Sequence, residues 1–277
     1  MADSAVISDR RLEREAARRR QARRGQAIAA LSSIVVLGGL AALVLTSPGW
    51  PTVRETFFSW SEFKNCFPEV LEGFWLDVKI FMVVEVAVLI LALAIALIRT
   101  SGSPALFPVR LLATVWVDLF RGVPTILLVY LVGFGVPALQ LEGLPTEPVV
   151  LGGIALLLSY SAYVAEVYKA GIRSVHRGQH DAALAVGLTH SQAMRHVILP
   201  QAVRRVAAPL LNDFVALQKD VALISILGPL EAFRLAQIFQ GENFNYTPLI
   251  AAALLYLMVT VPLARVVDRM GGSGGVR

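Results

Sequence analysis

The chain has 277 residues, of which 56% are apolar and 16% charged, with a formal net charge of +5 and a mean hydropathy of +0.65. An ordinary soluble protein is roughly 45–50% apolar and about 25% charged, so this composition excludes a soluble enzyme and a disordered chain. The single cysteine, Cys66, excludes a secreted scaffold built on disulfides. The composition indicates a polytopic membrane protein.

Six segments are long and apolar enough to cross a bilayer, which takes ~20 mostly apolar residues in a helix. In chain order they are 27–46, 80–98, 122–141, 148–165, 206–230 and 243–264. Only the second and fifth contain charged residues, namely Glu85 in the second and Asp213, Lys219 and Asp220 in the fifth. The pattern therefore predicts an all-α integral membrane protein with six transmembrane helices.

The basic residues predict the orientation of these spans. Eight arginines lie in residues 1–25. In the six-span arrangement three further segments lie on the same side of the membrane, and the four together contain nineteen Lys and Arg residues: 1–25, 99–110, 168–205 and 265–277. The loops of the other side, 47–73, 142–147 and 231–242, contain only three. Short cytoplasmic loops are enriched in Lys and Arg, so we expect both termini in the cytosol.

The same pattern divides the chain into four parts. Residues 1–25 form a cytosolic Arg-rich tail, and 26–73 form an N-terminal transmembrane helix with an outer connection. Residues 74–270 form the main transmembrane domain, and the Gly-rich end at 271–277 is a flexible tail.

The sequence lacks the usual motifs of catalysis. A nucleotide-binding P-loop needs Gly-Lys, yet the four lysines follow Phe63, Val78, Tyr168 and Gln218. His176 and His180 are four residues apart, which would place them on one face of a helix, but no third metal ligand has suitable spacing. We predict no catalytic residue, no metal site and no cofactor bound by this chain.

The loop between the fourth and fifth spans, 168–205, has a helical rather than a loop-like pattern. Residues 179–186 and 190–198 favour two short helices, Gly187 permits a sharp turn between them, and Pro200 is expected to end the second. Ala182 and Ala183 would leave one face smooth enough for close approach by another surface. We therefore expect the segment 181–200 to dock against a partner protein.

The residues of this loop resemble the EAA loop of ABC importer permeases. The shared pattern is Asp181-Ala182-Ala183, Gly187 after three residues, and Val197-Ile198-Leu199-Pro200 after nine more. Further segments are similar to the polar amino-acid permeases: 119–124 (LFRGVP), 165–172 (AEVYKAGI), 177–179 (RGQ), 199–202 (LPQA), and Lys219-Asp220 with 223–225 (LIS). The resemblance extends from about Phe74 to about Met270 and departs from the family in two places. Asp181 stands where Glu is usual, and Val221-Ala222 stand where Thr-Ser is common.

The resemblance implies the membrane subunit of an ATP-driven importer for polar amino acids in a bacterial cell membrane. It implies a type I importer core of five spans, to which this chain adds one N-terminal span. Its partners would be two ATPase subunits that bind ATP and Mg²⁺, a second permease subunit (a copy of this chain or a sister chain) and an extracytoplasmic solute-binding protein. The residues expected to couple to the ATPase are Asp181, Ala182, Ala183, Gly187, Val197, Leu199 and Pro200.

Charged residues inside spans are the candidates for the translocation path, since they are costly in lipid and normally face a partner or a water-filled route. Glu85 could contact the ammonium group of an amino acid, or it could pair with a basic group such as Lys219. At 100° per residue, one arc of the fifth span carries a set of four polar residues, Asn212, Asp213, Lys219 and Asp220. This arc suits a central cavity, a subunit interface or ion pairing between helices.

Two other functions fit the residues. One is an ion-coupled secondary transporter or channel subunit, with Glu85 and Asp220 as its ion sites. The other is an ABC permease for a different small solute, such as an opine or a small peptide.

Overall fold

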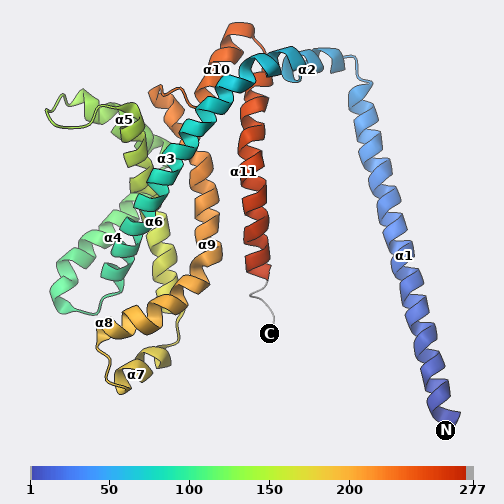
Figure 1. The fold of residues 1–277 in the computed structure, drawn as a ribbon, viewed down its shortest axis with the longest axis horizontal. Helices are drawn as coiled ribbons and strands as arrows, with labels where there is room; N and C mark the ends of the chain where they lie inside the picture. Colours follow the sequence, from blue (N-terminus) through green and yellow to red (C-terminus); the bar gives the residue numbers. More distant parts are fainter. Residues whose placement is uncertain (1, 273–277) are drawn as a thin grey trace. The chain divides into compact units, whose positions relative to one another are not determined.

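The computed structural model describes residues 2–272, without the side chains of 2–20, 22, 23, 27 and 270–272. Most of the predicted tail 271–277, from residue 273 on, lies outside the described residues. Every element within the described range is a helix (Figure 1). In chain order they are α1 (Ala2–Leu45), α2 (Trp50–Phe57), α3 (Trp60–Thr100), the 3₁₀ helix η1 (Pro104–Leu106), α4 (Phe107–Gly122), α5 (Thr125–Ala138), α6 (Pro148–Ser174), α7 (Arg177–Ala185), α8 (His190–Ala193), the π turn η2 (Met194–Ile198), α9 (Leu199–Asp220), the 3₁₀ helix η3 (Val221–Leu227), α10 (Ala232–Asn243) and α11 (Thr247–Gly272).

The chain divides into two compact units, with the boundary between Thr56 and Phe57. The first unit contains α1, which includes the first predicted span and runs on without a break through the segment predicted as a tail. Its apolar side chains are exposed all around, with Ile34 at 68%, Leu37 at 65% and Leu43 at 70% exposure. A helix that is apolar on every side and uncovered by protein fits a lipid environment.

In the second unit, α3 begins earlier than the second predicted span, inside the stretch predicted as an outer connection. Ser59 caps it, with its hydroxyl oxygen accepting from the Glu62 backbone N–H. The helix then continues for 41 residues to Thr100. Because α3 is so long, it packs against α6 with one half and against α10 and α11 with the other (Figure 1).

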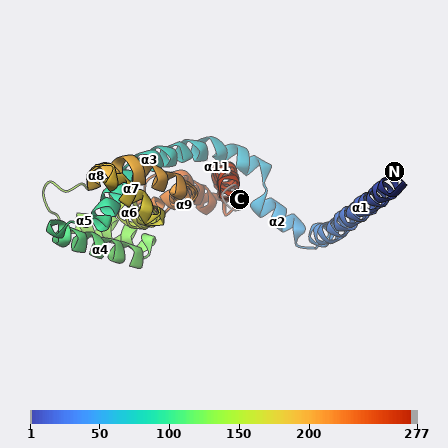
Figure 2. The same ribbon diagram turned by 90° about the horizontal axis from the view of Figure 1, so that it is seen from below.

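The main core lies where α3, α4, α6 and α9 meet. Val88 and Ala92 of α3, Leu156 and Ala165 of α6, and Leu217 of α9 are fully buried there. A second core joins α3 to α10 and α11 around Cys66, Val70 and Ala251. Seen from below, α4 and α5 lie on one side of α6, and α9 and α11 lie on the other (Figure 2).

The count of spans depends on two bent helix pairs. Four helices are long and apolar enough to cross a membrane, and the number rises to six if each bent pair counts as one span. In the first pair, the chain bends by 103° between α4 and α5. Val123 is extended there because Pro124 disfavours the helical conformation in the residue before it. The third predicted span, 122–141, therefore contains only α5, a helix of 14 residues.

The second bent pair corrects the expectation for the segment 231–242, which was predicted as an outer loop. It is mostly helix α10, which follows η3 at a bend of 53°. Gly228 makes the turn between them with φ +103. The bend therefore lies at the end of the predicted fifth span, 206–230, which itself contains most of α9 and all of η3.

Candidate functional site

The loop 168–205 folds as predicted, as two short helices around a glycine. Gly187 has φ +89, a left-handed conformation that costs a residue with Cβ about 1–2 kcal/mol. The His176 side chain accepts from the Gly178 backbone N–H at the start of α7, and Thr189 with Gln192 forms a capping box at the start of α8. Both helix starts are thus capped by side chains of the loop itself.

Contacts at its base fix the loop to the ends of α6 and α9. Ile172, Val175, Ile198 and Ala202 form a small buried cluster. Gln201 Nε2 of α9 donates to Gln179 Oε1 of α7 at 3.3 Å and to the Val197 carbonyl at 2.9 Å. A force on α7 would therefore reach α9 through side-chain contacts as well as through the chain.

Ala183 corrects the sequence prediction of a smooth Ala-Ala face. It is only 4% exposed and faces into the loop, whereas Ala182 and Asp181 are exposed. Val186, which the sequence pattern did not single out, is 79% exposed. The accessible surface of the loop thus combines Asp181, Ala182, Val186 and the turn at Gly187.

Pro200 does not end the second helix, contrary to the sequence prediction. The π turn Met194–Ile198 precedes it, and the Leu199 N–H bonds to the Met194 carbonyl five residues back. Pro200 then lies in the first turn of α9, where a missing N–H is tolerated. Pro200 is exposed, whereas Val197 and Leu199, two further residues expected to couple to the ATPase, are half-buried.

A buried ionic cluster joins α3 to α6 just above this loop. Glu166 accepts from Lys169 Nζ at 3.0 Å and from the Arg99 guanidinium. The Arg99 side chain is only 6% exposed, and those of Glu166 and Lys169 are 28% and 16% exposed. Spacing alone suggested an exposed Glu166–Lys169 pair, but the third member lies 67 residues away in the sequence.

The predicted path residues separate into two groups. Glu85 of α3 and Asp213 of α9 are electrostatic neighbours, and Asp220 accepts from the Tyr160 hydroxyl of α6 at 2.8 Å. Asp213 Oδ2 is buried without a hydrogen-bond partner. Asn212 and Lys219, in contrast, are exposed. The structure therefore brings carboxyl groups of α3 and α9 together between α3, α6 and α9.

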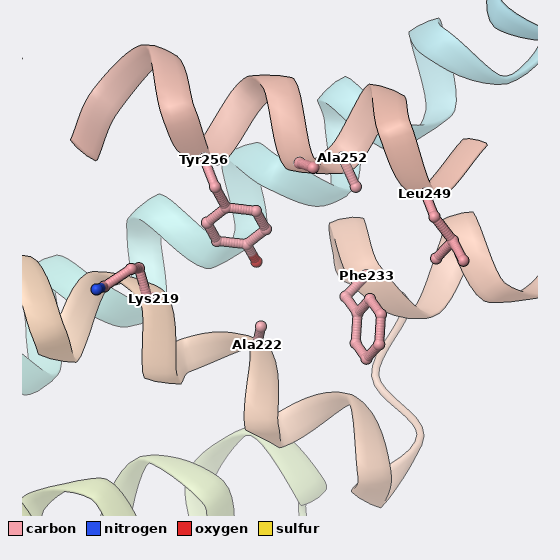
Figure 3. Close-up of a pocket in the computed structure, with 7 residues that line it drawn as sticks. Lys219, Ala222, Phe233, Leu249, Ala252 and Tyr256 are labelled. Carbon is pink, nitrogen blue, oxygen red and sulfur yellow. The ribbon is translucent and has the colours of Figure 1, made fainter. Parts of the chain in front are cut away.

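The proposed pairing of Glu85 with Lys219 is not found. Among the residues that the structure describes, the ion pairs involve Arg99, Lys169, Glu166, His180 and Asp181. Lys219 instead borders a cavity of about 330 Å³ between η3, α10 and α11. Figure 3 shows its side chain directed away from Ala222 and Phe233, which line the same cavity. Ala222, which belongs to one of the two departures from the family pattern, thus contributes no hydroxyl to this cavity.

The comparisons with known proteins agree with the resemblance. Residues 101–271 match the family described as binding-protein-dependent transport system inner membrane component. The arginine transport system permease protein ArtQ of Bacillus subtilis is 32% identical over 197 residues, covering 71% of this chain and 88% of that protein. The glutamine transport system permease protein GlnP of Escherichia coli is 28% identical over 214 residues, covering 77% of this chain and 96% of that protein.

Solved structures show the same fold. A chain from the crystal structure of an amino acid ABC transporter with histidines superposes with a TM-score of 0.68 and 29% identity, covering 76% of this chain and 96% of that chain. A chain of the MetNI methionine ABC transporter has a TM-score of 0.59 at 18% identity and covers 73% of this chain and 94% of that chain. This chain therefore belongs to the family of inner-membrane components of binding-protein-dependent transport systems.

Proposed function

We propose that this chain is the membrane subunit of an importer that brings basic amino acids, whose side chains carry an ammonium or guanidinium group, into the cytoplasm, driven by ATP that separate partner subunits hydrolyse. The single observation that carries the choice of substrate is the group of carboxyls between α3, α6 and α9. Glu85 and Asp213 are neighbours there, Asp220 lies about two turns further along α9 against Tyr160, and no ion pair in the described part of the chain neutralises them. Relatives named for arginine, glutamine and other amino-acid transport support the class of cargo.

The polar arc of α9 would supply the rest of the path. Asn212 and Lys219 lie on the exposed side of α9, where the carboxylate of a substrate or a second permease subunit could approach. The Tyr160 hydroxyl holds Asp220 in place, so that its carboxylate is presented in one orientation. A cationic substrate would thus meet fixed acceptors rather than mobile ones, which lowers the entropy cost of binding.

Coupling to ATP hydrolysis would act through the loop 168–205. We place Asp181, Ala182, Val186 and Gly187 against one of two ATPase subunits, which would bind ATP and Mg²⁺. Val197, Leu199 and Pro200 would transmit the movement to α9. An extracytoplasmic solute-binding protein and a second permease subunit complete the proposed assembly, with both termini of this chain in the cytosol.

The test is ATP-dependent uptake by proteoliposomes containing this permease with its ATPase and solute-binding protein. We expect uptake of a basic amino acid. This uptake should require ATP on the side of the membrane that carries the ATPase, and it should stop when the binding protein is left out. Uptake driven by an ion gradient in the absence of ATP would contradict the proposal and favour the secondary transporter. ATP-dependent uptake of another solute only would retain the ABC mechanism and reject the amino-acid substrate.

A further inference from the structure

Two acidic side chains are buried together outside the site described above. Asp77 of α3 is 2% exposed and Glu231, just before α10, is 0% exposed. They lie at the α10 end of the second unit, where α3 packs against α10 and α11. Two unneutralised carboxylates in such a place would be strongly destabilising, because burial penalises each charge and the two charges repel.

Gly73 creates the close approach that brings them together. A Cβ at this position would lie 2.7 Å from the Ala232 backbone nitrogen and the Glu231 carbonyl carbon. Asp77 is four residues further along α3, on the same helix face. Its carboxyl therefore lies where α10 begins, beside the Ala232 N–H and close enough to the Glu231 carboxyl for the two charges to interact.

The hydrogen bonds around Glu231 are those of a carboxylate. Its two oxygens accept from the backbone N–H groups of Phe233 at 2.7 Å and Arg234 at 2.6 Å, which caps α10. A negative charge is favoured at a helix N-terminus, and both contacts need an acceptor. Glu231 is thus the member of the pair that is best stabilised as an anion.

Asp77 has the opposite pattern. Its Oδ2 accepts from the Tyr256 hydroxyl of α11 at 2.8 Å, while its Oδ1 is buried and has no donor partner. A protonated Oδ1 would itself be a donor, and the Glu231 carboxyl is the acceptor within reach. A proton on Asp77 Oδ1 would therefore give this oxygen a hydrogen bond and would also remove the repulsion between the two carboxylates.

We propose that Asp77 holds a proton on Oδ1 and donates it to the Glu231 carboxylate, so that the pair carries one negative charge and joins α3 to α10. Tyr256 fixes the Asp77 carboxyl from the side of α11. The cations on the neighbouring elements are Arg234 of α10, whose charge acts on Glu231, Lys79 of α3, and Lys219, which borders the cavity beside Tyr256. This site is independent of the cargo and of the proposed coupling loop.

The inference predicts how the assembled transporter responds to pH. The unfolded chain releases this proton near the ordinary pKa of a carboxyl group, ~4, whereas the folded protein retains it. Folding therefore takes up one proton above that pH, and each unit of rising pH lowers the folding equilibrium constant up to tenfold until the folded pair also ionises. The protein should be most stable at the acidic end of this range.

The test compares Asp77→Asn with wild type in the full transporter complex in detergent. The asparagine amide can accept from Tyr256 and donate to Glu231, so it reproduces the protonated state without titrating. We expect the two melting temperatures to be most similar at about pH 4, with a growing advantage of Asp77→Asn toward about pH 9. Glu72→Gln, at an exposed position of the same helix, should keep the wild-type pH profile.

Glu231→Gln identifies which carboxyl holds the proton. A glutamine cannot accept through both terminal atoms, so this variant should melt at a lower temperature at every pH. Tolerance of Glu231→Gln together with intolerance of Asp77→Asn would overturn the assignment. Parallel pH profiles for wild type and Asp77→Asn would also overturn it, as would a sodium-dependent melting temperature that Asp77→Asn abolishes, which would indicate a bound cation.

A measurement on the wild-type complex alone keeps the proposal testable if the variants do not fold. Infrared spectroscopy at about pH 7 should detect the carbonyl stretch of a protonated carboxylic acid. Absence of such a band would overturn the proposal. Where Asp77→Asn does fold, it should lower the intensity of the band, while Glu72→Gln leaves it unchanged.

Discussion

At the scale of single residues, the neighbours of a charged side chain indicate whether it contacts substrate or forms a structural ion pair. Glu85 has no basic partner among the described ion pairs, and it lies beside Asp213 on α9. A residue kept only to neutralise a neighbour would be placed next to a cation. This geometry favours contact with a cation that arrives from outside the chain.

The first prediction concerns Glu85→Gln, which removes the charge and keeps the shape. We expect the complex to assemble at the wild-type yield, with uptake of a cationic amino acid reduced ~10-fold or more, as for a lost charge-assisted hydrogen bond of about 1.5–3 kcal/mol. The measurement is uptake per assembled complex. A reduced yield with unchanged uptake per complex would instead assign Glu85 a structural role.

The second prediction concerns the backbone at Gly187. A Cβ there would meet no atom within 4 Å, so any cost of substitution comes from φ +89 and not from crowding. We expect Gly187→Val to reduce substrate-stimulated ATP hydrolysis and co-purification of the ATPase, while Gly187→Asn retains most of both, since Asn tolerates the left-handed region. Equal effects of Val and Asn would show that the turn conformation is not the cause.

At the scale of elements, the loop shows how a helix pattern can be right while its orientation is wrong. The sequence predicts α7 and α8 within a few residues of where they begin and end. It cannot assign the buried face of a helix of nine residues that has alanines on two sides. Packing against η2 turns Ala183 inward and leaves Val186 outside.

This orientation gives the third prediction, a matched pair of tryptophan variants. Ala182→Trp should leave the permease stable and prevent binding of the ATPase, because position 182 is exposed. Ala183→Trp should destabilise the loop itself, by about 1–3 kcal/mol for overpacking. Co-purification of the ATPase and proteolysis of the loop distinguish the two; retention of the ATPase by Ala182→Trp would argue against this docking surface.

The fourth prediction concerns the ionic cluster between α3 and α6. Glu166→Gln leaves the buried Arg99 guanidinium without its anionic partner, so we expect a loss of about 1–3 kcal/mol in stability, seen as a lower melting temperature. Lys169→Met removes the more flexible partner and should cost less. A larger effect of Lys169→Met than of Glu166→Gln would contradict the central role given to Glu166.

At the scale of the whole molecule, the charge asymmetry of the loops leads to the fifth prediction. Both termini should be cytosolic, so a Ser4→Cys variant should resist a membrane-impermeant thiol reagent in intact cells and react after the cells are opened. The native Cys66 is fully buried and is expected not to react with the reagent. Ready labelling of Ser4→Cys in intact cells would refute this topology.

The sequence by itself determined the class of the protein, the apolar segments and the family, because these depend on composition, length and local motifs. It also located the turn at Gly187, since a left-handed residue between two helical patterns is a local feature. It fixed neither the number of crossings nor the direction of the helices around Pro124 and Gly228. A bend depends on the contacts made by the helices on both sides of it.

Only the tertiary structure decided which charged residues meet. Arg99 with Glu166, Tyr160 with Asp220, and Asp77 with Tyr256 are separated by 67, 60 and 179 residues, so no spacing rule could pair them. Asp77 and Glu231 lie just outside the predicted spans 80–98 and 206–230, and only the close approach at Gly73 brings their two segments together. Periodicity tells which face of a helix is apolar, but the energy of a buried charge depends on the partner brought to it by packing.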